Sequence, residues 1–153
     1  MSQSEEVLKA AAELVEFFGS GKITQYFNCF SSDADFIFYT HNEKLSSRAA
    51  YEELWKEWEE EMELKVLSCT SSNQNVRLLD SENAVFTHDV STQLSTKDGQ
   101  DRVLERETIV FTLLKGKWLA VHEHFPLSKL KTIVSRSRTL SCPSFVLNRV
   151  ETS

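Results

Sequence analysis

The stretch GKWLAVHEHFP, from Gly116 to Pro126, decides how this chain folds. Aromatic and β-branched residues fill it, and a glycine turn and a proline bound it, which is typical of a β-strand. Side chains on a strand alternate between its two faces. Strict alternation therefore places Trp118, His122 and His124 on one face and Glu123 on the other.

Three longer segments before this strand show the same two-residue period, over residues 64–79, 84–96 and 102–114. The first of them is long enough to contain a bulge. Asp98-Gly99 is a hairpin signal, and Lys115-Gly116 marks a second tight turn. Together with the closing strand, these segments predict a meander of four long antiparallel strands.

The N-terminal part of the chain has helical periodicity. Ser2 and Glu5 form a capping-box pattern before a helix that ends at Gly19, and a shorter helix follows over residues 23–30. Residues 35–40 predict a first strand, and Ser46 and Ser47 precede a helix over residues 48–62. The order α-α-β-α-β-β-β-β predicts an α+β fold in which a curved sheet wraps the N-terminal helices.

Composition restricts the functional classes. The chain has 153 residues, a formal net charge of -6 and three cysteines without metal-ligand spacing. The negative charge argues against nucleic acid as the main partner, and no apolar run is long enough to span a membrane. We expect a cytoplasmic protein. Five of the six charged residues in 127–153 are basic. This contrast predicts a domain over 1–126 and a basic, serine-rich extension over 127–153.

The element order and the closing strand resemble the nuclear transport factor 2-like superfamily, and SnoaL-like domains within it. The association domain of calcium/calmodulin-dependent protein kinase II is similar at the Gly116-Lys117-Trp118 stretch and at Val121-His122-Glu123-His124. The resemblance covers roughly residues 4–126 and implies a cone-shaped α+β barrel with a pocket between the helices and the concave face of the sheet. Because the superfamily contains both enzymes and assembly modules, it does not specify a reaction.

The resemblance also implies that the face carrying Trp118 is the concave one. His122 and His124 would then lie in the pocket beside Trp118, with His122 as a general acid or base. The alternative is that each histidine is a structural residue with a hydrogen-bond partner. His88, together with His122 and His124, could form a zinc site, but no fixed ligand spacing supports one, and we expect no metal or cofactor.

Two other residues complete the predicted site. Arg106 would bind an anionic group of the ligand, or else pair with an acidic residue on the sheet surface. Tyr39 would stabilise an oxyanion at the pocket mouth, or else be a packed aromatic residue with its hydroxyl at the rim. Trp55 would line the pocket, or else be a core residue of its helix. His88, His124 and Trp118 are the other predicted ligand-binding residues.

Two functions follow from this interpretation. The first is a small-molecule-binding domain, acting as an isomerase, cyclase or dehydratase by proton transfer on a small carbonyl or carboxylate compound. The second is a non-catalytic homodimeric module for protein interaction or assembly. Strand residues are apolar on both faces, so in either case we expect a homodimer through the sheet.

Overall fold

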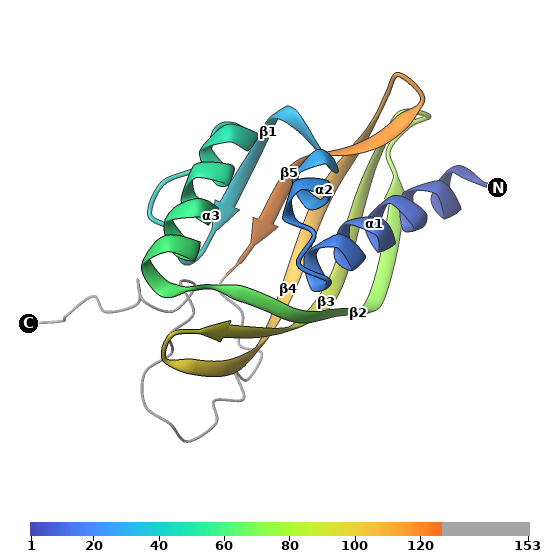
Figure 1. The fold of residues 1–153 in the computed structure, drawn as a ribbon. Helices are drawn as coiled ribbons and strands as arrows, with labels where there is room; N and C mark the ends of the chain where they lie inside the picture. Colours follow the sequence, from blue (N-terminus) through green and yellow to red (C-terminus); the bar gives the residue numbers. More distant parts are fainter. Residues whose placement is uncertain (127–153) are drawn as a thin grey trace, which may run out of the picture.

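A single curved sheet with three helices makes up the computed structural model, which describes residues 1–126 (Figure 1). The helices are α1 (Gln3–Gly19), α2 (Ile23–Asn28) and α3 (Arg48–Met62). The strands are β1 (Phe30–Phe38), β2 (Lys65–Leu78), β3 (Asn83–Thr96), β4 (Gly99–Leu114) and β5 (Lys117–Phe125). The predicted element order is therefore confirmed. The predicted extension over 127–153 lies outside the described residues.

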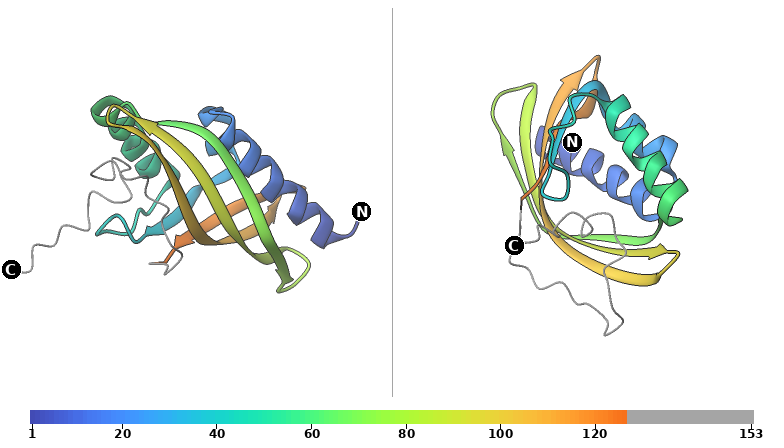
Figure 2. Two further views of the ribbon diagram at one scale, coloured as in Figure 1. Left: turned by 90° about the horizontal axis from the view of Figure 1, so that it is seen from below. Right: turned by 90° about the vertical axis from the view of Figure 1, so that its left-hand side faces the viewer.

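The strand order in the sheet is β1-β5-β4-β3-β2. The four later strands pair in an antiparallel meander, as predicted, whereas β1 joins the edge of β5 in parallel. The sheet curves strongly, and α1 and α3 lie on its concave side (Figure 2). The α+β fold with a curved sheet around N-terminal helices is thus confirmed.

Local signals in the sequence set the helix boundaries. The Ser2 hydroxyl accepts a hydrogen bond from the Glu5 backbone at 3.2 Å, and the Ser2 backbone donates to the Glu5 carboxylate at 2.6 Å. These two bonds complete the predicted capping box. The Ser47 hydroxyl caps α3 by accepting from the Ala50 backbone at 3.1 Å. Within residues 1–126, the helices are too short or too polar to cross a bilayer.

Aromatic packing joins α3 to the sheet. The Tyr51 ring lies 4.7 Å from the Phe36 ring, 5.1 Å from the Phe38 ring and 5.0 Å from the Phe27 ring, all measured between centroids. Tilted and edge-on ring contacts of this kind stabilise a core beyond the area that they bury. This cluster holds α3 over β1.

An irregularity in β5 changes which side chains face the helices. Val110 pairs with His122, but the next residue of β4, Phe111, pairs with Ala120. Val121 is therefore the extra residue of a β-bulge, and a bulge of one residue reverses the alternation of the side chains beyond it. Trp118 and Ala120 are buried before the bulge, and Glu123 is buried after it.

Candidate functional site

A cavity lies between the helices and the concave face of the sheet, with a volume of about 90 Å³. That is several times the space that one water molecule needs. Most of its wall is apolar, and aromatic rings come from both the helices and the sheet edge. These rings include Phe18, Phe38, Tyr51, Trp55, Trp58 and Phe125. Ligand pockets usually measure roughly 300–1,000 Å³, so this cavity has room only for a very small molecule.

Three glutamates form the polar part of the cavity wall: Glu105 and Glu107 from β4, and Glu123 from β5. Glu107 and Glu123 are buried, with 4% and 1% of their surfaces exposed. Glu123 pairs with Ile109, which is two residues from Glu107 on the same face of β4, so the two carboxyls are diagonal neighbours. The bulge at Val121 is the reason why the Glu123 side chain points toward Glu105 and Glu107.

Burial changes the acid strength of these groups. Desolvation raises the pKa of Glu105 from its ordinary value of 4.5 to about 7, although a hydrogen bond from Tyr39 opposes the rise. Desolvation and the neighbouring Glu107 carboxylate raise the pKa of Glu123 well above its ordinary value. The cavity therefore holds two carboxyls that retain protons at a pH where exposed carboxyls have lost them.

A sequence match shows the family to which the chain belongs. The sequence profile of the SnoaL-like domain family matches residues 7–127. The chain belongs to the SnoaL-like domain family. No curated protein matches its sequence.

Solved structures share the fold of this SnoaL-like domain. A Xanthomonas campestris protein assigned to the calcium/calmodulin-dependent protein kinase II association domains has a TM-score of 0.68 at 22% identity, over 82% of this chain and 87% of its own. The hub homology domain of that kinase from Chlamydomonas reinhardtii has a TM-score of 0.64 at 20% identity, over 84% and 100%. A Catenulispora acidiphila protein in complex with S-DNPA has a TM-score of 0.65 at 14% identity, over 79% and 91%.

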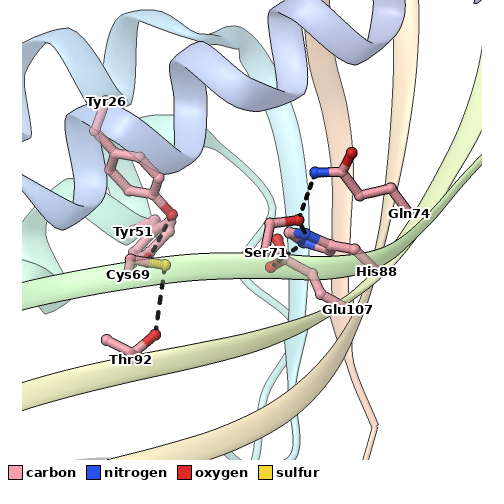
Figure 3. A network of polar contacts seen from close by, with 8 residues as sticks. All are labelled: Tyr26, Tyr51, Cys69, Ser71, Gln74, His88, Thr92 and Glu107. Carbon is pink, nitrogen blue, oxygen red and sulfur yellow. Dashed lines mark hydrogen bonds and ion pairs between the residues drawn. The ribbon is translucent and has the colours of Figure 1, made fainter.

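A chain of hydrogen bonds leads from the edge of the SnoaL-like sheet to the cavity (Figure 3). Gln74 donates to the Ser71 hydroxyl at 2.9 Å, and Ser71 Oγ lies 2.6 Å from His88 Nδ1. His88 Nε2 lies 3.0 Å from Glu107 Oε2. The arrangement that satisfies every group has Ser71 donating to Nδ1 and the Nε2–H of His88 donating to Glu107. His88, on the neighbouring strand β3, therefore orients the Glu107 carboxyl through this hydrogen bond.

Three buried polar atoms of cavity-lining residues have no hydrogen-bond partner among residues 1–126. They are Trp55 Nε1, Glu107 Oε1 and Glu123 Oε2. Native proteins satisfy nearly all their buried polar groups, so unpaired atoms that cluster around one cavity are unusual. Of these atoms, Trp55 Nε1 lacks a partner among residues 1–126, whereas the Glu107 and Glu123 carboxyls form a hydrogen bond with each other when Glu123 holds its proton.

Two tyrosines and a thiol complete the polar surface of the cavity. The Tyr26 and Tyr51 hydroxyls lie 3.2 Å apart, and burial raises the pKa of both well above its ordinary value. Burial also raises the pKa of the Cys69 thiol to about 11, although the Thr92 hydroxyl donates to its sulfur. These groups are therefore neutral at physiological pH, and Cys69 is not an activated nucleophile.

The predicted positions of His122 and His124 are wrong. Neither lines the cavity, because the Val121 bulge reverses the alternation and turns Glu123 inward instead. His122 Nδ1 lies 2.5 Å from Asp35 Oδ1 across the parallel pairing of β1 and β5. The alternative role, a histidine with a partner on a neighbouring strand, describes His122.

The predicted positions of Arg106 and Trp118 also need correction. Arg106 lies on the opposite face of β4 from Glu105 and Glu107, with 62% of its side chain exposed, and its Nε donates to Asp89 at 3.0 Å. This is the surface ion pair considered as its alternative. Trp118 faces the helices but is not among the residues that line the cavity. Its Nε1 donates a hydrogen bond to the Glu6 carboxylate of α1 at 3.1 Å.

The other predicted site residues lie at or next to the cavity. Tyr39 and Trp55 line it, as expected, and His88 contacts it through Glu107. The three histidines considered for zinc do not come together, and no group of three or more potential ligands within residues 1–126 is arranged to hold a metal ion.

The three glutamates were not among the site residues predicted from the sequence. A signal was present for two of them, since Glu105 and Glu107 occupy the same alternate positions as the apolar Val103, Ile109 and Phe111 of β4. Acidic residues on the apolar face of a strand indicate a polar site in the core. Glu123 had no such signal, because its orientation depends on the bulge.

Proposed function

We propose that this SnoaL-like domain binds a small, largely apolar compound in the cavity and transfers protons to and from it through Glu123 and Glu105. The observation that carries the proposal is the group of buried carboxyls in an aromatic cavity, two of them with raised pKa values. Titratable groups perturbed by burial in a pocket are typical of functional sites.

The two carboxyls suit complementary roles. The raised pKa of Glu123 keeps its proton available for donation to a carbonyl oxygen as negative charge develops there. Glu105, with a pKa of about 7, can accept a proton and return it at neutral pH, which is the condition for efficient general acid–base catalysis. Tyr39 holds the Glu105 carboxyl through its hydrogen bond.

The same carboxyls favour some substrates over others. A carboxylate compound would bring a second negative charge into a wall of glutamates, and Arg106 lies outside the cavity, where it cannot compensate. Repulsion between two carboxylates is strong in a poorly hydrated cavity. We therefore favour a carbonyl compound over a carboxylate. An isomerisation, cyclisation or dehydration proceeding by proton transfer is the class of reaction that such a site supports.

A thermal-shift screen with metabolites tests the proposal, using wild type, Glu123→Gln and His122→Ala. A ligand raises the melting temperature by mass action. We expect compounds that shift wild type and His122→Ala equally but shift Glu123→Gln much less. His122 is the matched control because it lies on the same strand but faces away from the cavity. Equal shifts in Glu123→Gln would refute the assigned role of Glu123.

An assembly role is the second candidate, and it does not exclude the first. Hub and association domains are among the structures with this fold. The outer face of the sheet carries Ile37, which is 40% exposed, and the partly buried Val110 and Val121. A homodimer through this face would cover them. Light scattering on wild type and Val110→Asp tests this idea, since the dimer predicts that only the variant is monomeric.

A further inference from the structure

The Glu107 and Glu123 carboxyls form a hydrogen bond with each other only while one of them holds a proton. The carboxyl that holds the proton is the one that can act as an acid. Building on the proposed function, we propose that His88 is a positioning residue that keeps Glu107 ionised, so that the shared proton resides on Glu123. His88 acts through Glu107, since it is not among the residues that line the cavity.

Two ionised carboxyls cannot lie together at this place in the sheet. Glu107 and Glu123 are both buried, and they are diagonal neighbours on the paired strands β4 and β5. Like charges so close together in a desolvated site strongly disfavour double ionisation, so the pair retains one proton. In a symmetric pair, either carboxyl would hold that proton equally well.

The pair is not symmetric, because one of its members has a hydrogen-bond donor behind it. His88 Nε2 lies 3.0 Å from Glu107 Oε2, and both side chains are buried. A donated hydrogen bond stabilises a carboxylate more than a neutral carboxyl, and the low dielectric of the interior strengthens it. Among residues 1–126, no such donor reaches Glu123. The free energy is therefore lower with the charge on Glu107 and the proton on Glu123.

The neighbours of His88 determine which of its nitrogens carries the proton (Figure 3). Ser71 Oγ lies 2.6 Å from His88 Nδ1, and the exposed Gln74 donates to the same hydroxyl at 2.9 Å. A neutral imidazole has one donor and one acceptor nitrogen, so an Nδ1 that accepts from Ser71 leaves Nε2 as the donor. With this arrangement, every donor from Gln74 inward points toward Glu107.

The other groups that face the pair do not reverse this preference. Tyr26 of α2, Tyr51 of α3 and Cys69 of β2 stay protonated at neutral pH because burial raises their pKa values. They therefore add no charge that could favour one carboxyl over the other. Glu105 of β4 repels both members of the pair, so it does not choose between them. His88 is the group that makes the difference.

The position of the proton decides which carboxyl can serve the proposed reaction. With the proton on Glu107, the Glu123 carboxyl would be an acceptor only and could not donate to a carbonyl oxygen. Donation from Glu123 leaves both carboxyls charged until the proton returns, which is unfavourable in a buried site. The pair therefore favours reactions in which Glu123 recovers its proton within the same turnover, and an isomerisation is such a reaction.

Carbon NMR on the full chain tests the proposal, with glutamate isotopically labelled at the side-chain carboxyl. The two carboxyls titrate as a pair, so only a probe that resolves each site can locate the proton. Each carboxyl carbon reports its own protonation, and Glu107→Gln and Glu123→Gln assign the two resonances. In wild type we expect Glu123 protonated and Glu107 ionised from about pH 6 to about pH 8.

Three variants test whether the donor of His88 sets this distribution. His88→Leu removes the donor, so the chemical shifts of the two carboxyl carbons should approach each other. His88→Gln retains a side-chain N–H donor and should restore much of the wild-type separation. Ser71→Ala is a milder change on β2 that lets the ring exchange tautomers, so it should move both shifts in the same direction as His88→Leu but by less. His124→Leu, on the opposite face of the sheet, is the matched control and should leave both shifts unchanged.

The outcomes separate this inference from the proposed function. Unchanged shifts in both His88→Leu and Ser71→Ala would overturn the role of His88 and leave Glu123 as the acid. An equal loss of separation in His88→Gln and His88→Leu would indicate packing instead of donation, and it would also overturn this role. A wild-type protein with the proton on Glu107 would overturn both the role of His88 and the proposed acid. If His88→Leu does not fold, Ser71→Ala decides the test. The NMR experiment needs no ligand, so the thermal-shift screen succeeds or fails independently of it.

Discussion

Replacement of Glu105 by glutamine should remove a pH dependence from the stability of this protein. The folded-state pKa of Glu105 is about 7, whereas its ordinary value is 4.5. The folded protein therefore holds the Glu105 proton more tightly than the unfolded chain does. This contribution is fully present below about pH 4.5 and is lost as the pH rises through about 7.

The size of the effect follows from the same pKa difference. A tenfold change in proton affinity is equivalent to about 1.4 kcal/mol, so the full difference corresponds to about 3 kcal/mol. Glu105 is only partly buried, so solvent screening reduces this effect. We therefore expect wild type to lose about 1–2 kcal/mol relative to Glu105→Gln between about pH 5 and about pH 8.

Urea denaturation followed by tryptophan fluorescence, repeated across this pH range, measures the difference directly. Subtracting the Glu105→Gln curve from the wild-type curve cancels the titrating groups that are distant from Glu105, whereas Glu107 and Glu123, which interact with it, still contribute to the difference. Glu57→Gln, an exposed substitution on α3, is the control and should run parallel to wild type. Parallel curves for wild type and Glu105→Gln would refute the placement of Glu105 in a desolvated wall.

Three further substitutions or treatments test other parts of the structure. Gly19→Ala should cost about 1–3 kcal/mol in urea denaturation, because the added carbon would lie 2.8 Å from the backbone nitrogen of Cys69. A more stable variant would contradict this close approach. His88→Ala should lower the free energy of unfolding by about 2–4 kcal/mol in the same assay, because it creates a cavity and removes a partner from Glu107. An unchanged urea midpoint would argue against the buried contact between His88 and Glu107. Cys29 and Cys69, each with a pKa of about 11, should react with iodoacetamide much more slowly in the folded protein than in urea at about pH 8, as peptide mapping would show.

Local patterns in the sequence were sufficient to predict the helices and most of the sheet. The Ser2–Glu5 capping box and the Asp98-Gly99 hairpin depend on residues that are close in the chain, and both occur where predicted. The parallel pairing of β1 with β5 was not predicted, because its residues are nearly ninety positions apart and no local signal specifies the partner.

The candidate site was predictable only in part. Trp55 lies in the cavity wall because the period of α3 aims its side chain at the sheet, and that period is visible in the sequence. His122 was assigned to the wrong face because strict alternation was carried through Val121, where the register shifts. A single extra residue reverses the face on which every later side chain lies, so the orientations predicted for all residues of β5 after Val121 were inverted.

Periodicity and turn chemistry along the chain were enough to predict the α+β order and the strand meander, and the closing strand carried the resemblance to SnoaL-like domains. Which polar residues share the cavity depends on the tertiary structure. Glu105, Glu107 and Glu123 meet because β4 and β5 pair with a bulge between them, and the pKa values of Glu105 and Glu123 rise because burial removes water from their carboxyls. Desolvation and charge proximity are properties of the folded arrangement, and they exist only once these distant segments pack together.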